Sequence, residues 1–409
     1  MTVIRVRAIH ATGFLNWGYD MARRALLAWE MGGGLGHIRR LMVVARAVEA
    51  AGFEPVIAQR TIHTLADEVR EAGYPMIPIP PQVSLAPKNE PFRALTYADI
   101  MAICGYAKMD ALEPTLDAWD GLLNYIQPSV VIGDYCPILP MAVRGRYPYL
   151  AFGDGFVVPP HDPPVFPPLR AHGAPIKPVD EITSDVNSLL AKRGQPQVER
   201  LGQLVAGDAQ VITTLPELDI YNDSRKQKAA GPLDELPAVR PIPAEPKLFI
   251  YLAADFNNTR KMLQAVVNAK VPAEAFIRSA SPELRDALRK AGMIVHDTPP
   301  PLEERLREAT VVLHHGGMGT LETALAMGCA QLLLPRHLEQ SLNSRNLKAR
   351  KIAEMIQGED IDEYARLVKL GLAASDWHKR VHKLATQLDK RRPFSCLEIV
   401  VQTVEKLAV

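Results

Sequence analysis

The chain has 409 residues, of which 47% are hydrophobic and 23% charged, a composition typical of a globular protein whose length favours two domains over one core. Its 47 lysines and arginines nearly balance its 46 aspartates and glutamates, which argues against nucleic acid as a partner. The four cysteines lack zinc-site spacing and no apolar run approaches the ~20 residues of a membrane span, so we expect a cytoplasmic protein without an integral membrane segment.

Residues 1–24 are predicted to be an N-terminal extension or a start-codon artefact, because the first convincing strand begins at Ala25, shortly after Met21. They contain neither a continuous apolar stretch nor a signal-peptide cleavage site, which argues against secretion. Short apolar runs then alternate with amphipathic stretches up to about residue 230. The alternation predicts strands and helices in turn at Ala25–Trp29, Ile38–Ala51, Pro55–Ala58, Ile62–Ala72, Ala94–Tyr125, Val130–Ile132 and Pro148–Phe152. This order indicates a parallel sheet flanked by helices, and we predict a first domain over residues 25–230.

Two proline-rich segments interrupt the alternation. The first, Val157–Pro178, holds eight prolines and is interpreted as a surface loop, with a loop that shapes a ligand cleft as the alternative. The second, residues 231–246, holds five prolines and is predicted to be a linker. The alternation then resumes over residues 247–376, so the predicted fold class is α/β with two doubly wound domains in tandem. The tail, residues 377–409, is predicted to form helices that pack back on the first domain.

A glycine-rich loop follows the predicted strand Val311–Leu313. It reads His314-His315-Gly316-Gly317-Met318-Gly319-Thr320, and a helical pattern comes after it. Strand, glycine loop and helix N-terminus together form an anion site, because glycines let the backbone approach a ligand and the helix presents free N–H groups. The sequence therefore predicts a pyrophosphate site. Glu322 is placed to bind a vicinal diol such as a ribose, and Glu339-Gln340 follows the next strand at the same sheet edge.

The stretch from His314 to Asn343, HHGGMGTLETALAMGCAQLLLPRHLEQSLN, resembles the donor-binding signature of family 1 glycosyltransferases, especially bacterial enzymes that glycosylate macrolides and glycopeptides. The resemblance implies a GT-B fold, in which two Rossmann-like domains face an interdomain cleft, with a nucleotide sugar as co-substrate and no cofactor. The resemblance assigns acceptor binding to residues 25–230 and donor binding to residues 247–376. Within the signature it implies that His314 binds the diphosphate and that Gly316, Gly317, Gly319 and Thr320 belong to the phosphate-binding loop. It also implies that Glu322 binds the ribose and that Glu339 and Gln340 bind the sugar hydroxyls.

A second match to the same superfamily is MGGGLGHIRRLMVVARAVEAAGFEPVIA, residues 31–58, which is similar to its first glycine-rich loop and helix. The resemblance implies that His37 is the general base for the acceptor hydroxyl and that Asp134 holds its other ring nitrogen. A structural histidine and a helix-capping aspartate are the alternatives. FGDGFVVPP, residues 152–160, resembles the following segment and makes Asp154 an acceptor-side candidate. Arg39 and Arg40 are interpreted as exposed residues of the first helical turn, with a contact to phosphate or to an acidic acceptor as the alternative.

Several features limit what the resemblance implies. The uracil-binding element of plant enzymes is missing, so both UDP and dTDP donors stay open, and Glu339 replaces the usual aspartate. Asp360-Ile361-Asp362 has metal-motif spacing but no buried strand before it, so we interpret it as a solvated turn and predict no catalytic metal. The prediction is an inverting transferase acting on a small-molecule or lipid acceptor. A GT-B nucleotide-sugar epimerase and a catalytically silent nucleotide-sugar-binding partner are the alternatives.

Overall fold

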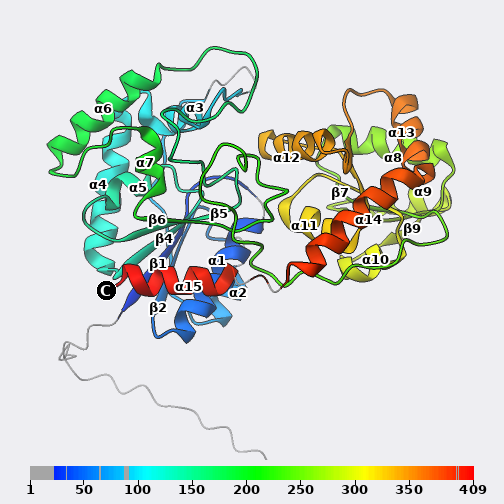
Figure 1. The fold of residues 1–409 in the computed structure, drawn as a ribbon, viewed down its shortest axis with the longest axis horizontal. Helices are drawn as coiled ribbons and strands as arrows, with labels where there is room; N and C mark the ends of the chain where they lie inside the picture. Colours follow the sequence, from blue (N-terminus) through cyan, green and yellow to red (C-terminus); the bar gives the residue numbers. More distant parts are fainter. Residues whose placement is uncertain (1–22, 34, 64–65, 87–91, 393, 395) are drawn as a thin grey trace, which may run out of the picture.

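The computed structural model describes residues 23–409 except 34, 64–65, 87–91, 393 and 395, so most of the predicted extension, residues 1–22, lies outside the described residues. In the described residues the strands form two six-stranded parallel sheets, each flanked by helices. Figure 1 shows the two sheets side by side, with the chain crossing from the first to the second and returning at its end.

The first sheet has the strand order β3-β2-β1-β4-β5-β6. Its strands are β1 (Arg24–Trp29), β2 (Glu54–Gln59), β3 (Met76–Pro78), β4 (Val130–Asp134), β5 (Tyr149–Gly153) and β6 (Ala209–Ile212). The helices around it are α1 (Gly36–Ala50), α2 (Ala66–Glu71), α3 (Tyr97–Met101), α4 (Met109–Ile126), α5 (Leu139–Val143), α6 (Val179–Lys192) and α7 (Leu201–Ala206). Helix α1 forms because its apolar residues recur at helical spacing, and that face is buried: Ile38, Leu41, Met42, Ala45 and Val48.

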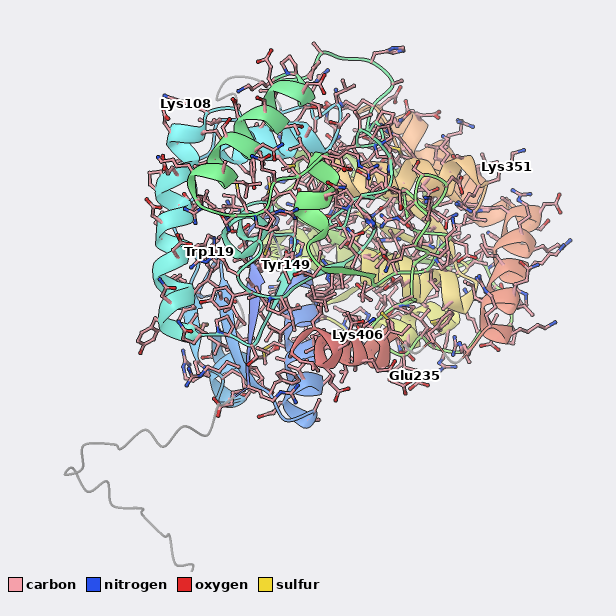
Figure 2. The ribbon with its side chains drawn as sticks, turned by 60° about the vertical axis from the view of Figure 1, so that its left-hand side comes forward. Lys108, Trp119, Tyr149, Glu235, Lys351 and Lys406 are labelled. Atoms are coloured by element: carbon pink, nitrogen blue, oxygen red, sulfur yellow. The ribbon has the colours of Figure 1, made fainter. Side chains whose placement is uncertain are left out.

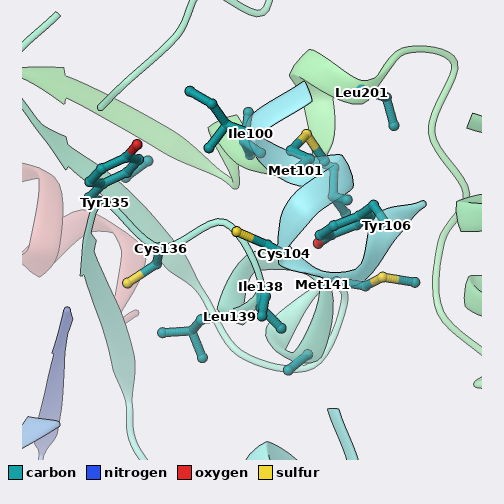
Figure 3. Packing of buried hydrophobic residues seen from close by; sticks show 14 of the residues in the cluster. Ile100, Met101, Cys104, Tyr106, Tyr135, Cys136, Ile138, Leu139, Met141 and Leu201 are labelled. Carbon is teal, nitrogen blue, oxygen red and sulfur yellow. The ribbon is translucent and has the colours of Figure 1, made fainter. Parts of the chain in front are cut away.

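The prediction of one long helical region over residues 94–125 is wrong in one respect. The structure divides it into α3, a widened turn at Ala102–Tyr106 and α4. Gly105 has a φ of 116°, a left-handed conformation that a helix interior does not accept, so the chain kinks there. The kink brings Cys104 beside residues of the loop after β4. Figure 3 shows this packing, with Ile100, Met101 and Cys104 facing Tyr135 and Cys136.

The second sheet has the order β12-β11-β10-β7-β8-β9. Its strands are β7 (Leu248–Ala253), β8 (Ala273–Arg278), β9 (Ile294–His296), β10 (Val311–His314), β11 (Ala330–Leu333) and β12 (Ala353–Met355). The helices of this half are α8 (Asn257–Ala269), α9 (Pro282–Lys290), α10 (Leu302–Glu308), α11 (Met318–Met327), α12 (Leu338–Ala349) and α13 (Ile361–Ala373). The two sheets have the same topology, because β7 to β12 occupy in the second sheet the places that β1 to β6 occupy in the first.

Each sheet reverses its strand order at one point, between β1 and β4 in the first and between β7 and β10 in the second. At these points the loops that leave the carboxyl ends of the two central strands diverge and open a crevice, where doubly wound sheets bind ligands. Trp29 pairs with Asp134 at the first point, and His314 pairs with Tyr251 at the second. The predicted site residues therefore follow strands that end at the two crevices.

Two C-terminal helices connect the halves. Helix α14 (Ser375–Lys390) packs on α11, whereas α15 (Cys396–Leu407) lies against α1 and the strands β5 and β6. Cys396, Val400 and Val404 of α15 belong to a core cluster of the first sheet, and Lys406 marks this helix in Figure 2. In the other direction, Leu215 and Leu218 pack into the core of the second sheet. No helix of the described residues has the length and apolarity to cross a membrane.

Candidate active site

A cleft of about 1090 Å³ lies between the two halves. Both predicted motifs contribute to it, because its walls include the loop before α1 on one side and the N-termini of α11 and α12 on the other. Leu338 and Leu342 of α12 pack against the core of the first sheet, and Leu338 also lines the cleft. The predicted site residues that line it are His37, Gly317, Gly319, Thr320, Glu322, Glu339 and Gln340.

His37 stands in the first turn of α1, where the glycine loop brings it over the end of β1. Its ring stacks on Trp29 with 5.3 Å between the ring centroids and an interplanar angle of 19°. Nδ1 lies 3.2 Å from Oδ1 of Asp134. Nε2 faces Gly32, where a Cβ would overlap it, so the missing side chain at Gly32 leaves this nitrogen room. The predicted partner of His37 is therefore in contact with it.

Asp134 is fully buried at the end of β4, and Arg40 is its second partner. Nε of Arg40 donates to Oδ2 and Nη2 donates to Oδ1, each at 3.0 Å. Burial alone would raise the pKa of Asp134, but the charges of Arg40 and His37 lower it below its usual value. The carboxylate is therefore ionised at neutral pH and supports a positive charge on either neighbour.

Arg40 also binds the acceptor-side candidate Asp154. Its Nη1 donates to Oδ2 of Asp154 at 2.9 Å, while Oδ1 of the same carboxylate accepts the N–H groups of Phe156 at 3.0 Å and Val157 at 3.4 Å. The interpretation of Arg40 as an exposed residue is wrong. Arg40 stands three positions after His37, which is nearly one helical turn, so both side chains point to the carboxyl edge of the sheet.

The predicted phosphate loop runs from the end of β10 to the first turn of α11. Gly316 has a φ of 84°, and its α-carbon lies against Ser344, so a side chain there would be strained. Gly317 is the N-cap of α11, and the N–H groups of Met318, Gly319 and Thr320 belong to the first turn, where helices leave N–H groups without backbone partners. At Gly317 and Gly319 a Cβ would meet no described atom within 4 Å, so a ligand can approach the backbone there.

His314 is buried, and the residues lining the cleft do not include it. Its Nε2 lies 2.9 Å from Oε1 of Gln331, and its Nδ1 accepts the N–H of Gly316 at 3.2 Å. Burial lowers the pKa of His314 to about 4, so the ring is neutral at physiological pH. Its predicted role as a diphosphate ligand stays a prediction, and a direct contact from the ring requires one of these two bonds to open.

Glu322 of the second half is hydrogen-bonded to Thr214 of the first half. The hydroxyl of Thr214, which follows β6, donates to Oε1 of Glu322 at 2.8 Å. Burial raises the pKa of Glu322 to about 8, against the opposing effects of Thr214 and Arg40. A residue of the first half thus orients the acid that we predict to bind the ribose. The sequence analysis did not single out Thr214, because the residue has no motif around it.

Glu339 and Gln340 stand at the N-terminus of α12. Oε1 of Gln340 accepts the backbone N–H of Arg336 at 2.9 Å, which fixes the amide group. Burial and the negative charge of Asp154 raise the pKa of Glu339 to about 8, while Arg40 opposes the shift. Glu339 therefore faces the acids of the first half across the cleft, and a ligand between them would contact both halves.

Two arginines, Arg278 and Arg336, line the donor side of the cleft, and the sequence analysis assigned no role to either of them. Arg336 pairs with Asp255 at 3.0 Å, and Arg278 at the end of β8 has no ion-pair partner among the described residues. Both charges act on His315, whose pKa falls to about 4 mainly through burial. His315 is held by the backbone, since its Nδ1 lies 2.8 Å from the carbonyl of Leu334 and its Nε2 accepts the N–H of Ala253.

Among the described residues, no group of three or more histidines, cysteines and acids is placed to hold a metal ion. Asp360 of the acidic turn is the N-cap of α13, where its Oδ1 accepts the N–H groups of Asp362 at 2.8 Å and Glu363 at 3.3 Å. A helix cap accounts for the aspartate at this position.

Comparisons with known proteins agree with this site and fold. No protein-family model matches the chain. A curated relative, a "PGL/p-HBAD biosynthesis glycosyltransferase" of Mycobacterium tuberculosis, is 24% identical over 399 residues, which cover 86% of this chain and 85% of the relative. Similar solved structures include the spinosyn forosaminyltransferase SpnP and the calicheamicin glycosyltransferase CalG4. They have TM-scores of 0.61 and 0.66 at 20% and 16% identity, and each match covers 95% of this chain and at least 98% of the other.

The fold is therefore the GT-B fold, as the sequence predicted. The predicted resemblance to family 1 GT-B glycosyltransferases is confirmed, and the curated relative is itself a glycosyltransferase. Another similar structure, the glycosyltransferase VinC, was solved in complex with dTDP and has a TM-score of 0.59 at 18% identity over 94% of this chain and 98% of that one.

The raised pKa of Glu339 predicts a pH dependence of donor binding. Only the ionised carboxylate accepts hydrogen bonds on both oxygens, so a nucleotide sugar should bind more tightly as pH rises towards about 8, by at most roughly tenfold per unit, and no further above it. Calorimetry between pH 6.5 and 9 measures this. Glu339→Gln should remove the dependence.

The control uses the same nucleoside diphosphate without its sugar. Glu322 titrates in the same range and should affect both ligands, whereas Glu339 should affect only the sugar-bearing one. Identical pH dependence for the two ligands would contradict a sugar contact at Glu339.

Proposed function

We propose that the protein transfers a sugar, with inversion, from a nucleotide-diphosphate donor to a hydroxyl group of an acceptor. The observation that carries this proposal is the cleft in which His37, in contact with Asp134, faces the first turn of α11 and the Glu339-Gln340 pair. A base on one wall and an anion site with sugar-binding groups on the other are what such a transfer needs.

In the proposed reaction the acceptor oxygen attacks the anomeric carbon as the bond from that carbon to the diphosphate breaks. The acceptor proton passes to Nε2 of His37, and the charge that develops on His37 is balanced by Asp134. The leaving diphosphate takes the electron pair of the broken bond. Because His314 is neutral, we assign the stabilisation of that charge to the N–H groups of α11 and to Arg278.

The acceptor side of the cleft supports an acceptor with an apolar body. Its wall is formed by large apolar side chains, namely Met31, Met42, Phe92, Ile100, Tyr135 and Phe156. We propose a small-molecule or lipid acceptor that carries a hydroxyl. The name of the curated relative refers to PGL/p-HBAD biosynthesis, which supports testing precursors of those compounds first. All four cysteines are buried thiols without disulfides, which supports the cytoplasm as the compartment.

A donor panel tests the donor part of the proposal. We expect dTDP and dTDP-sugars to stabilise the protein more than UDP and UDP-sugars, since similar structures were solved with thymidine diphosphate. A ligand at about 100 times its Kd should raise the free energy of unfolding by roughly 2.7 kcal/mol. Thermal shift measures this effect. An unchanged melting temperature with every nucleotide would contradict the donor site.

We predict that turnover does not need a divalent metal. The N–H groups of α11 and Arg278 are proposed to carry the leaving-group charge that a metal carries in other transferases. The rate should therefore be the same after dialysis against EDTA as before it. A rate that collapses in the chelator and returns with Mg²⁺ or Mn²⁺ would overturn this part of the proposal.

A nucleotide-sugar epimerase is the alternative that the cleft carboxylates Glu322 and Glu339 favour, because it would use the same donor site without an acceptor. Incubation of a nucleotide sugar alone, followed by NMR of the sugar, separates the two. An epimer formed without acceptor supports the alternative. Hydrolysis of the donor without epimerisation supports the transferase and argues against a catalytically silent binding partner.

A further inference from the structure

His37 has two competing partners at the same ring nitrogen. Its Nδ1 lies 3.2 Å from Oδ1 of Asp134 and 3.0 Å from Nη2 of Arg40. A guanidinium only donates hydrogen bonds, and a carboxylate only accepts them. The two contacts therefore require opposite states of Nδ1. The contact with Arg40 needs a lone pair on Nδ1, and the contact with Asp134 needs a proton there.

The surroundings hold Arg40 in the position that competes. Its Nε and Nη2 bind the two oxygens of Asp134 at 3.0 Å, and its Nη1 binds Asp154 at 2.9 Å. Both carboxylates are at most 1% exposed, so water does not replace these bonds. Such a pairing with two buried carboxylates fixes the plane of the guanidinium. Nη2 of Arg40 is held 3.0 Å from Nδ1 as a result, close enough to donate an N–H to it.

We propose that Arg40 is a positioning residue that keeps the neutral His37 ring in its Nε2–H tautomer in the unliganded protein. The inference rests on the proposed role of His37 as the base. With the proton on Nε2, this nitrogen has no lone pair to accept a proton from the acceptor. The base-competent tautomer has the proton on Nδ1, donated to Asp134, and forms when the bond from Nη2 to Nδ1 opens.

Consequently, His37 stands in the empty cleft in the tautomer that cannot accept the proton of the acceptor. The bonds of Arg40 to Oδ2 of Asp134 and to Asp154 do not involve Nδ1, so they persist when the Arg40–His37 bond opens. One N–H therefore decides which ring nitrogen carries the proton.

The test is ¹⁵N NMR of the histidine side chains of the full chain at pH about 8.5, where imidazoles are neutral. The two-bond ¹H–¹⁵N correlations distinguish a protonated ring nitrogen from one with a lone pair, and the spectrum of His37→Gln assigns the signals. In the wild-type protein we expect the proton on Nε2. In Arg40→Met the pattern should reverse, with the proton on Nδ1 and bonded to Asp134. A wild-type proton on Nδ1 would overturn the inference.

Arg39→Met is the matched control, because Arg39 is the neighbouring arginine on the exposed side of α1 and lines the same cleft. It should leave the His37 pattern unchanged. If Arg40→Met does not fold, Asp154→Asn weakens one anchor of Arg40 and should increase the fraction of the Nδ1–H tautomer. An unchanged fraction in a folded variant contradicts the inference. No substrate is needed, so the result stands apart from any failure of sugar transfer.

Discussion

Replacing His37 by alanine should lower kcat by roughly 10²–10⁴-fold, the usual contribution of a general base, while the affinity for the donor stays nearly intact. The separation is expected because His37 stands on the acceptor wall of the cleft, away from the first turn of α11. Steady-state kinetics with an acceptor whose hydroxyl is not activated, together with calorimetry of nucleotide binding, measures both quantities. Asp134→Asn should change kcat in the same direction but less.

Arg39→Ala is the control for this experiment, since it removes a neighbouring side chain of the same helix that makes no bond to Asp134. A purely structural histidine would give a different result, with a lower melting temperature and weaker donor and acceptor binding alongside the lower rate. If His37→Ala keeps a third or more of the wild-type kcat, the base must lie elsewhere, and Asp154 is the next candidate.

The second large effect is expected at Gly32, whose Cα lies in front of Nε2 of His37. A Cβ there would overlap that nitrogen and lie 3.1 Å from the ring of Tyr135, and the residue has a φ of 91°. Gly32→Ala should therefore displace either the loop or the imidazole. Since a shift of about 1 Å in a reacting group can cost 10²-fold in rate, we expect kcat to fall by about that factor or more.

The neighbouring glycine provides the control for Gly32→Ala. A Cβ at Gly33 would meet no described atom within 4 Å, so Gly33→Ala should leave kcat within a few-fold of wild type. The donor loop lies on the other wall, so neither variant should change nucleotide affinity in calorimetry. Equal rates for the two variants would show that Nε2 of His37 does not need the space beside Gly32.

Much of the fold was predictable because parallel strands buried on both faces give short apolar runs, and the helices between them give amphipathic ones. The loops at His37 and His314 were predictable because strand, glycine and helix follow each other locally. That the two loops face one cleft was implied by the resemblance to GT-B glycosyltransferases and not by the local pattern. Gly105 was the exception in the fold, since its left-handed conformation depends on packing and has no local pattern.

The contacts that modify the site were not predictable in the same way. Arg40 depends on Asp134 and Asp154, which are 94 and 114 residues away along the chain. Glu30, fully buried beside the glycine loop, accepts N–H groups from Ile138 and Leu139 and thereby positions the loop after β4. Such pairings arise when strands distant in sequence end at one edge. A single sequence gives no signal for them beyond the residue type.

The burial of His314 also shows that the sequence did not predict the partner of a side chain. Its position in the motif implied a ligand contact, but the direction of the ring is decided by Gln331 on the neighbouring strand, which offers a hydrogen-bond acceptor at 2.9 Å. Motif position locates a residue on the backbone. It does not determine which of two available partners the side chain takes.

The most direct test of sugar transfer uses a dTDP-sugar with an α-anomeric linkage and an alkyl phenol as acceptor. The product is analysed by NMR for the wild-type protein and for His37→Ala. We expect a β-linked glycoside and an equal amount of released dTDP from the wild-type protein, and neither above a small fraction from the variant. An α-linked product would contradict inversion, and full activity in the variant would contradict the base. If the donor is instead converted to its epimer without acceptor, the protein does not transfer the sugar.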